Sequence, residues 1–121
     1  MLLKLRGAGF PLFVCTSKRE HFAVRILDHF ELSPLFAGIF GDKPEYASRK
    51  KADLLGTLLR EHGLRRETAW MIGDRIYDFD AARANHLRSL GVGWGYGSPE
   101  EWAQADVVAA APGDVQALVT P

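Results

Sequence analysis

The chain has 121 residues, of which 47% are hydrophobic and 25% charged, and 15 Lys plus Arg balance 15 Asp plus Glu. These figures are those of one ordinary globular domain, and they give no sign of a nucleic-acid partner or a membrane span. A single cysteine excludes an internal disulfide, so a cytoplasmic protein is expected.

Segments typical of strands and helices alternate along the first half of the chain. Residues 11–15 are predicted to form a strand, residues 19–30 a helix, residues 37–40 a weak strand, and residues 51–62 a second helix. The first helix places five apolar side chains on one face: Phe22, Ala23, Ile26, Leu27 and Phe30. The second helix repeats this pattern with leucines, and Gly63 stands where a helix commonly ends.

The alternation continues to the carboxyl end of the chain. Strands are predicted at residues 69–72, 87–92 and 106–110, with a helix from about residue 77 to residue 85. Ser98 has the marks of a helix cap, because a proline follows it directly and a glutamate stands three residues on. With a short closing helix, the series predicts an α/β fold in which helices cover both faces of a parallel sheet.

Polar side chains mark two of the predicted helix entries. Thr16 and Ser17 end the first strand, and a hydroxyl beside free N–H groups at a helix N-terminus forms a phosphate site. Taken alone, this dipeptide is more often an ordinary helix cap. Lys50 and Lys51 begin a later helix, where a cation is mildly unfavourable unless an anion compensates it. Taken alone, such lysines are more often a solvated surface pair.

Two carboxylates mark a third helix entry. The apolar run of residues 69–72 ends at Gly73, and Asp74 and Asp78 follow at the turn into the next helix. In open α/β sheets, ligands bind beyond the carboxyl ends of strands. Oxygen ligands at this spacing suit Mg²⁺, which pairs one or two carboxylates with a substrate phosphate. The alternative is that Asp74 caps the helix and Asp78 lies in its first turns.

The order of hydroxyl, lysine and acidic pair resembles the haloacid dehalogenase-like superfamily, and most closely its phosphoglycolate-phosphatase-like branch. Residues 13–18 resemble its second motif, Lys51 its third-motif lysine, residues 71–78 its fourth motif, and residues 91–98 the glycine-rich loop that follows the next strand. The resemblance covers nearly the whole chain. It implies a Rossmann-like, three-layer α/β/α core, here a partial catalytic domain over residues 1–121 without a cap domain.

The resemblance also implies a reaction and the residues that perform it. Family members hydrolyse phosphate monoesters through an aspartyl-phosphate, with Mg²⁺ as cofactor and small phosphorylated metabolites as substrates. Asp74 and Asp78 would hold the metal, and Lys51 would place a positive charge against the phosphate. Thr16 and the backbone N–H of Ser17 would bind a phosphoryl oxygen. A monomer or a homodimer is expected.

The chain departs from the family pattern at the first motif. That motif is a strand ending in Asp-x-Asp, which carries the nucleophile, but the first aspartate of this chain is Asp28, inside a predicted helix. Residues 1–121 alone are therefore expected to be inactive. The second hypothesis is a non-catalytic fragment or a partner-binding α/β domain.

The absent strand has a structural consequence as well. In the family it lies centrally, between the strands that end at Thr16 and at Asp74. Burying about five apolar residues contributes about 7–15 kcal/mol, which is comparable with the whole stability of a domain. The chain is therefore expected to be marginally stable, to close its sheet over the gap, or to pair with a partner chain.

Overall fold

The fold is taken from a computed structural model that describes residues 1–44 and 50–120. The helices are α1 (Leu2–Gly7), α2 (Glu20–His29), α3 (Lys51–Glu61), α4 (Ile76–Ala84), α5 (Pro99–Trp102) and α6 (Val115–Val119). The strands are β1 (Phe13–Arg19), β2 (Gly38–Asp42), β3 (Trp70–Gly73), β4 (Arg88–Val92) and β5 (Val107–Ala109). Short 3₁₀ turns occupy Ser33–Leu35 and Pro112–Asp114. The predicted alternation of strands and helices is thus confirmed.

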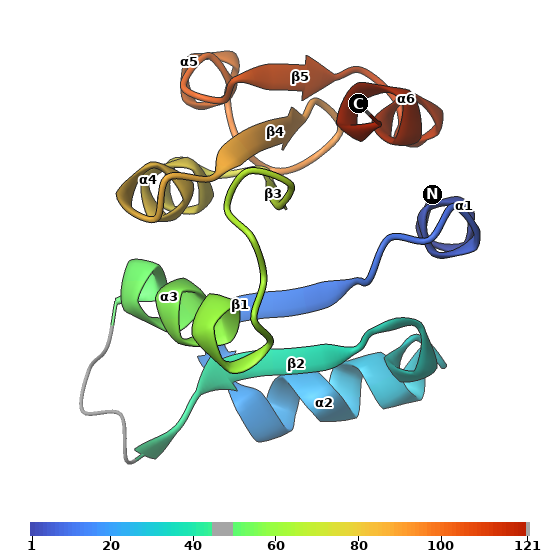
Figure 1. The fold of residues 1–121 in the computed structure, drawn as a ribbon, viewed down its shortest axis with the longest axis vertical. Coiled ribbons are helices and arrows are strands. Elements are labelled where there is room, and N and C mark those ends of the chain that lie inside the picture. The colour runs from blue at the N-terminus through green and yellow to red at the C-terminus, as the bar shows by residue number, and fades with distance from the viewer. Residues whose placement is uncertain (45–49, 121) are drawn as a thin grey trace.

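The strands form two parallel sheets. β1 pairs with β2 in one sheet, and the other has the order β3-β4-β5. Figure 1 shows the first sheet and α2 below the second sheet and α4 to α6. The break falls between β1 and β3, which is where the absent central strand was expected. Within the described residues the sheet has not closed over this gap.

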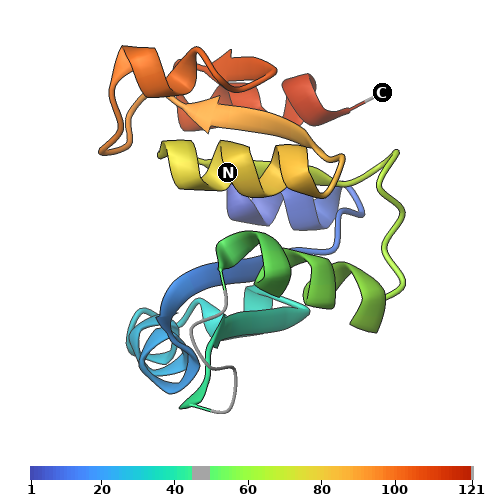
Figure 2. The same cartoon turned by 90° about the vertical axis from the view of Figure 1, so that its left-hand side faces the viewer.

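The strands of both sheets point the same way. In Figure 2, β1, β2 and β4 all run from right to left, and β3 is parallel to β4. The same view shows α3 and α4 beginning at the left-hand edge, where the strands end. This edge therefore collects the carboxyl ends of the strands and the N-termini of two helices, an arrangement in which α/β proteins bind ligands.

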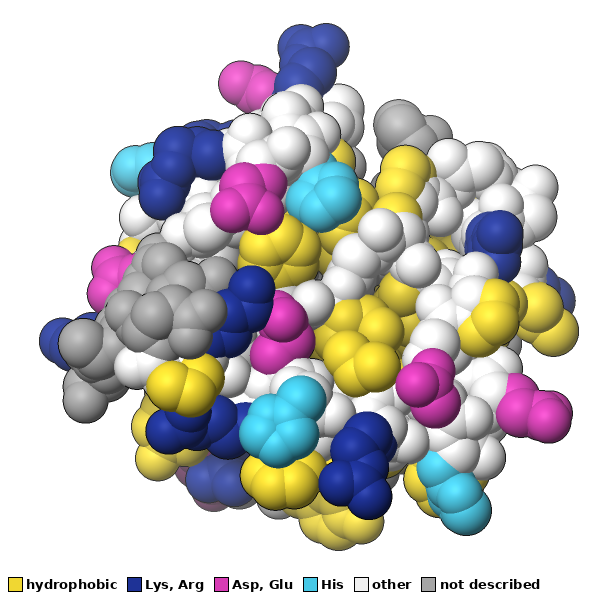
Figure 3. Space-filling view, turned by 90° about the horizontal axis from the view of Figure 1, so that it is seen from below, with side chains coloured by type: hydrophobic (Ala, Val, Ile, Leu, Met, Phe, Trp, Pro, Cys, Tyr) yellow, Lys and Arg dark blue, Asp and Glu magenta, His cyan; other side chains and the backbone are white. Residues whose placement is uncertain are grey.

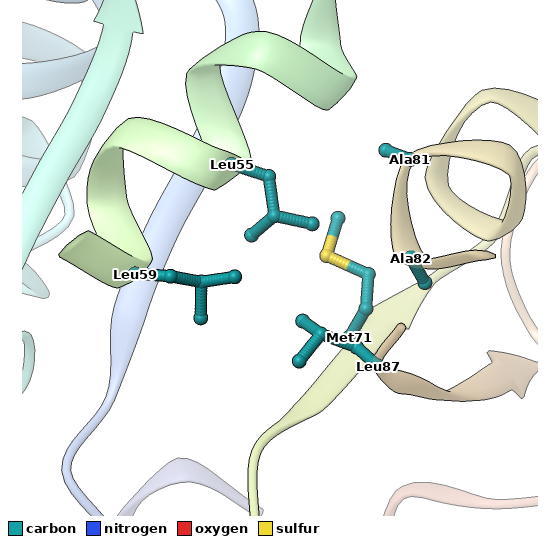
Figure 4. Close-up of a cluster of buried hydrophobic side chains, with 6 residues drawn as sticks. All are labelled: Leu55, Leu59, Met71, Ala81, Ala82 and Leu87. Atoms are coloured by element: carbon teal, nitrogen blue, oxygen red, sulfur yellow. The ribbon is translucent and has the colours of Figure 1, made fainter. Parts of the chain in front are cut away.

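Two apolar clusters hold the layers together. In the first, Leu55 and Leu59 of α3 point toward Met71 of β3, across the space between the sheets (Figure 4). In the second, Leu5 of α1 packs with Leu90 of β4 and with residues of β5 and α6. α3 also contacts β1, β2 and α4. The two sheets are therefore joined through helices and side chains rather than through strand hydrogen bonds.

The structure corrects two local expectations. β1 continues past Thr16 to Arg19, and its pairing with β2 shifts register between Cys15 and Arg19, so Thr16 and Ser17 lie in an irregular strand segment ahead of α2. A strand irregularity of this kind re-aims side chains at the edge of a sheet. The dipeptide therefore does not cap the helix, whose N-cap is Arg19.

The apolar face predicted for α2 is divided between the core and the surface. Ala23 is buried, but Phe22, Ile26 and Phe30 are 50%, 47% and 65% exposed. Figure 3 views the molecule from the α2 side, where apolar side chains reach the surface among basic and histidine side chains. Among the described residues, no helix has the length and apolar character needed to cross a membrane.

Candidate active site

A buried ion pair joins two of the predicted site residues. The Lys51 ammonium at the first turn of α3 donates to Oδ1 of Asp78 in the first turn of α4. The two side chains are 19% and 9% exposed. Lys51 therefore lies at a helix N-terminus, where a cation is unfavourable because this end of the helix dipole is positive. The Asp78 carboxylate offsets both positive charges.

The second oxygen of Asp78 holds the turn that follows β3. Oδ2 accepts hydrogen bonds from the backbone N–H of Asp74 at 3.1 Å and of Arg75 at 3.2 Å. A Cβ at Gly73 would lie 2.2 Å from this oxygen, so only glycine lets the carboxylate approach the backbone this closely. Asp78 therefore fixes the turn and Lys51 at the same time.

The glycine-rich loop after β4 packs directly against Asp74. The backbone N–H of Tyr96 donates to Oδ2 of Asp74 at 2.9 Å, and the Trp102 indole donates to the Asp74 carbonyl at 3.1 Å. A Cβ at Gly95 would lie 2.3 Å from the Asp74 Cβ, and one at Gly97 would lie 1.7 Å from its carbonyl oxygen. These glycines have a steric role, because they bring the loop into contact with the acidic turn.

α5 ties the start of α4 to this loop. Glu101 Oε2 accepts from the backbone N–H of Ile76 at 2.8 Å and from Nε of Arg75 at 3.1 Å. These two hydrogen bonds, the backbone one first, lower the pKa of Glu101. The Ser98 hydroxyl accepts from the Glu101 N–H at 3.2 Å, which confirms the predicted cap. The reach of Glu101 to α4 has no signal in the sequence, because the contact depends on how α5 and α4 pack.

β1 contributes the remaining predicted residues. Its Cys15 lies near the ion pair: burial raises the pKa of this thiol to about 11, with smaller opposing effects of the Lys51 and Asp78 charges. Thr16 follows it, and the Thr16 hydroxyl accepts from the backbone N–H of Lys18 at 3.2 Å.

Among the described residues, no hydrogen bond joins Thr16 or Ser17 to Lys51 or to the acidic turn. The structure brings together Lys51, Asp74 and Asp78, and places Thr16 on a neighbouring strand end.

The donor set fits a hard cation that takes part of its coordination from a substrate. Asp74 is half-buried and has one carboxylate oxygen, Oδ1, without a protein partner in the described residues. Both oxygens of Asp78 are already engaged. No cluster of three potential metal ligands occurs in the described part of the chain. This arrangement suits Mg²⁺, which keeps several waters and binds through one or two carboxylates plus phosphate oxygens.

The chain is similar in sequence to several known proteins, each of which is longer than this chain. The chain is 39% identical over 101 residues to a 5'-nucleotidase of Pseudomonas aeruginosa, covering 84% of this chain and 46% of that protein. It is 40% identical over 97 residues to the tyrosine-protein kinase PtkA of Mycobacterium tuberculosis, covering 80% of this chain and 33% of that protein. Identity to a phosphoglycolate phosphatase of Aliivibrio fischeri is 31% over 109 residues, covering 88% and 48%.

The fold has close structural counterparts. A haloacid dehalogenase-like family protein of Streptococcus pneumoniae superimposes with a TM-score of 0.88 at 31% identity, covering 98% of this chain and 57% of that one. The chain thus spans about half the length, or less, of the proteins that it resembles. The sequence profile of haloacid dehalogenase-like hydrolases matches residues 1–92. On this match and on the shared parallel α/β core, the chain belongs to the haloacid dehalogenase-like hydrolases.

Proposed function

We propose that this chain forms the larger part of the active-site edge of a Mg²⁺-dependent phosphate monoester hydrolase. The observation that carries the proposal is the meeting of Lys51 with Asp78, directly beside the turn of Asp74. The names of the three relatives all concern phosphoryl groups, which supports the reaction class. A nucleotidase and a phosphoglycolate phosphatase among them favour a small phosphorylated metabolite as substrate. The proposal keeps the expectation of a cytoplasmic monomer or homodimer.

Each site residue has a task in this proposal. Lys51 supplies positive charge to a phosphoryl oxygen and to the attacking carboxylate, while Asp78 holds its ammonium in place. Asp74 would hold Mg²⁺ through its available oxygen, with Asp78 in or beside the coordination shell. When bound, the metal would offset the charge of a phosphate dianion. Thr16 and the N–H of Ser17 would bind another phosphoryl oxygen and orient the phosphate for attack.

None of the residues named in this proposal supplies the nucleophile. An aspartyl-phosphate mechanism needs a carboxylate aimed at phosphorus, on the opposite side from the leaving oxygen. Asp78 is engaged by Lys51 and by the backbone, and the described residues that line the gap between β1 and β3 include no carboxylate. We therefore propose that residues 1–121 alone bind Mg²⁺ and phosphate but do not turn over a monoester.

Calorimetric titration of the chain with inorganic phosphate, with and without Mg²⁺, tests the binding site. Phosphate is expected to bind more tightly with Mg²⁺, and Asp74→Asn should abolish that difference. Lys51→Met should weaken phosphate binding roughly tenfold, as expected for loss of one charge-assisted hydrogen bond. Asp80→Asn is the matched control, because Asp80 is 58% exposed on α4, the helix that follows the turn of Asp74. Phosphate binding that is indifferent to Mg²⁺ and to Asp74 would contradict the proposal.

A phosphatase assay tests the expected inactivity. p-Nitrophenyl phosphate, phosphoglycolate and nucleoside 5'-monophosphates are suitable esters, since they represent the relatives' substrates and a general one. No Mg²⁺-dependent hydrolysis above the background is expected from residues 1–121. Turnover that depends on Mg²⁺ and is lost in Asp74→Asn would show that the chain contains its own nucleophile.

A further inference from the structure

A shallow groove of about 670 Å³ runs along the outer side of α2. Its apolar lining consists of Phe22, Ile26 and Phe30, which stand four residues apart and are about half exposed or more. The opposite side of the helix is seated on the sheet, since Ala23 is buried and α2 contacts both β1 and β2. The apolar stripe of this α2 groove therefore has no cover among the residues that the structure describes.

The rest of the α2 groove is basic, on the side of the molecule that Figure 3 shows. Its other lining residues are Lys18, Arg19, Arg25 and His29, and no carboxylate belongs to the described lining. Arg19 pairs with Asp42 at 3.2 Å, whereas neither Lys18 nor Arg25 forms an ion pair with any described residue. Two cations of the groove are thus available to an occupant.

The acidic side chains of α2 do not compensate these cations. Glu20 accepts from the backbone N–H of Gly41 at 3.2 Å and pairs with Lys43 at 3.4 Å. Asp28 accepts from the hydroxyl of Ser33. Both carboxylates of the helix therefore have partners elsewhere in this chain. A groove that keeps a positive charge favours an occupant of negative charge, because complementary potentials steer association and select the partner.

The spacing of the stripe indicates the shape of the occupant. Phe22 and Phe30 mark its two ends, and each ring packs beside a histidine ring: the centroids of His21 and Phe22 are 4.1 Å apart and those of His29 and Phe30 are 5.0 Å apart. Eight residues of helix rise about 12 Å, which is slightly more than two turns. The apolar ridge of a second helix, with side chains at i, i+4 and i+7, fits a stripe of this length.

The charge of the α2 groove disfavours a second copy of this chain as its occupant. A two-fold dimer brings the same patch of both protomers together, so Lys18 and Arg25 would face cations of the partner. An anionic bilayer shares the charge preference of an acidic protein. However, α2 has 10 residues and a stripe of two turns, whereas many helices that bind at a membrane surface have about 20–30 residues.

We propose that the α2 groove is a docking site for an acidic amphipathic helix of another protein. The apolar side chains of that helix repeat at i, i+4 and i+7 and cover the stripe, and glutamates or aspartates beside them pair with Lys18 and Arg25. Docking does not depend on the proposed function, because Lys51, Asp74 and Asp78 are not part of the groove.

Three labelled peptides test the docking by fluorescence anisotropy with the whole 121-residue chain. Each has about 15 residues, a length at which an isolated helix begins to form. The acidic peptide has leucines at i, i+4 and i+7 with glutamates beside them; the second peptide carries glutamine, and the third lysine, in place of every glutamate. In low salt the acidic peptide should bind saturably at one per chain, and the glutamine peptide about tenfold more weakly, since two exposed ion pairs are lost. The lysine peptide should not bind.

Substitutions then locate the binding site. Ile26→Ser should weaken binding of the acidic peptide at least about tenfold, whereas Val108→Ser on β5 is the matched control, because Val108 is 46% exposed and Ile26 is 47% exposed. Arg25→Glu should weaken the acidic peptide and allow the lysine peptide to bind. Arg65→Glu should do neither, since this side chain is 77% exposed outside the groove. Circular dichroism checks that the four variants fold, and the comparison of the three peptides needs no variant.

Several results would overturn the docking site. These are a lack of saturable binding of the acidic peptide, equal binding of the glutamine peptide in low salt, or an acidic peptide that binds Ile26→Ser as well as the unchanged chain. Vesicles of phosphatidylcholine and phosphatidylserine that bind through Ile26, when the acidic peptide does not bind, would assign the groove to a membrane surface. Dimerisation that Ile26→Ser abolishes in sedimentation equilibrium, again without peptide binding, would assign it to a second copy.

Discussion

Replacing Asp78 by asparagine removes the charge that holds the candidate site together. The carboxylate accepts from Lys51 through one oxygen and from the backbone N–H groups of Asp74 and Arg75 through the other. An asparagine side chain has one oxygen, so it can serve only one of these two sides. If its oxygen keeps the backbone, its NH₂ group faces the ammonium; if it keeps Lys51, two backbone donors lose their acceptor.

Both outcomes are costly by a similar amount. Breaking a buried ion pair from one side costs about 3–5 kcal/mol, and an unsatisfied buried donor costs about 1–3 kcal/mol. Because Lys51 keeps 19% of its side-chain exposure, we take the lower part of the range and expect Asp78→Asn to lose about 3 kcal/mol. Against a total stability of about 5–15 kcal/mol, this is a large fraction.

Urea unfolding followed by far-UV circular dichroism measures this loss. Asp80→Asn is the control, because its partner Arg83 and Asp80 itself are each 58% exposed, and such a pair contributes less than about 1 kcal/mol. In the double variant Lys51→Met/Asp78→Asn, part of the loss should be recovered, since no unpaired ammonium is left. If Asp78→Asn were as stable as the control, the ion pair would not organise this turn.

Three further predictions concern the surroundings of the site. Burial raises the pKa of Cys15 to about 11, so the rate of its alkylation should keep rising up to about pH 11. The stability that the protonated thiol gives below pH 9 should be lost between pH 9 and 11, because the thiol of the unfolded chain ionises first. Alkylation that levels off near pH 9 would contradict this. Hydrogen bonds lower the pKa of Glu101, so the unchanged chain should be more stable than Glu101→Gln in melting curves at neutral pH. This difference should disappear as the pH falls through the lowered pKa. A difference that does not depend on pH would argue against the role of the carboxylate. Gly97→Ala should lower the unfolding free energy by more than about 1 kcal/mol, because the added Cβ would overlap the Asp74 carbonyl. The control Gly113→Ala, whose Cβ would have no atom within 4 Å, should be close to neutral in the same urea assay. Equal effects of the two substitutions would refute the steric role of Gly97.

The periodic signals of the sequence located the strands β1 to β5 and the helices α2 to α4, but not α1. Lys51 was expected at a helix start and begins α3, and Ser98 was expected to cap a helix and accepts from Glu101. Both signals are local, since they depend on residues within one helical turn. The predicted end of the first strand, residue 15, was wrong by four residues, because β1 continues to Arg19. Pairing with β2 across a register shift prolongs the strand, and the residues of β1 alone do not indicate this shift.

The apolar pattern of α2 shows a different limit. Periodicity groups Phe22, Ala23 and Ile26 on one face, but it does not say which part of a wide face meets the sheet. Only the small Ala23 is buried against β1 and β2, while Phe22 and Ile26 remain about half exposed. Local sequence patterns likewise do not predict the contacts of Glu101 and Tyr96 with the turn that follows β3, because these contacts arise from the packing of segments far apart in sequence.

The divided sheet bears directly on how precisely the site is built. Thr16 lies on the β1–β2 sheet, whereas Asp74 follows β3 in the other sheet, and no strand hydrogen bond among residues 1–44 and 50–120 connects the two sheets. Their relative position depends on α3, which contacts β1 and carries Lys51 to Asp78. Positioning of phosphate, metal and nucleophile is where most of the catalysis of phosphoryl transfer originates. The packing of α3 and its Lys51–Asp78 pair therefore set how precisely a phosphate can be held between Thr16 and Asp74.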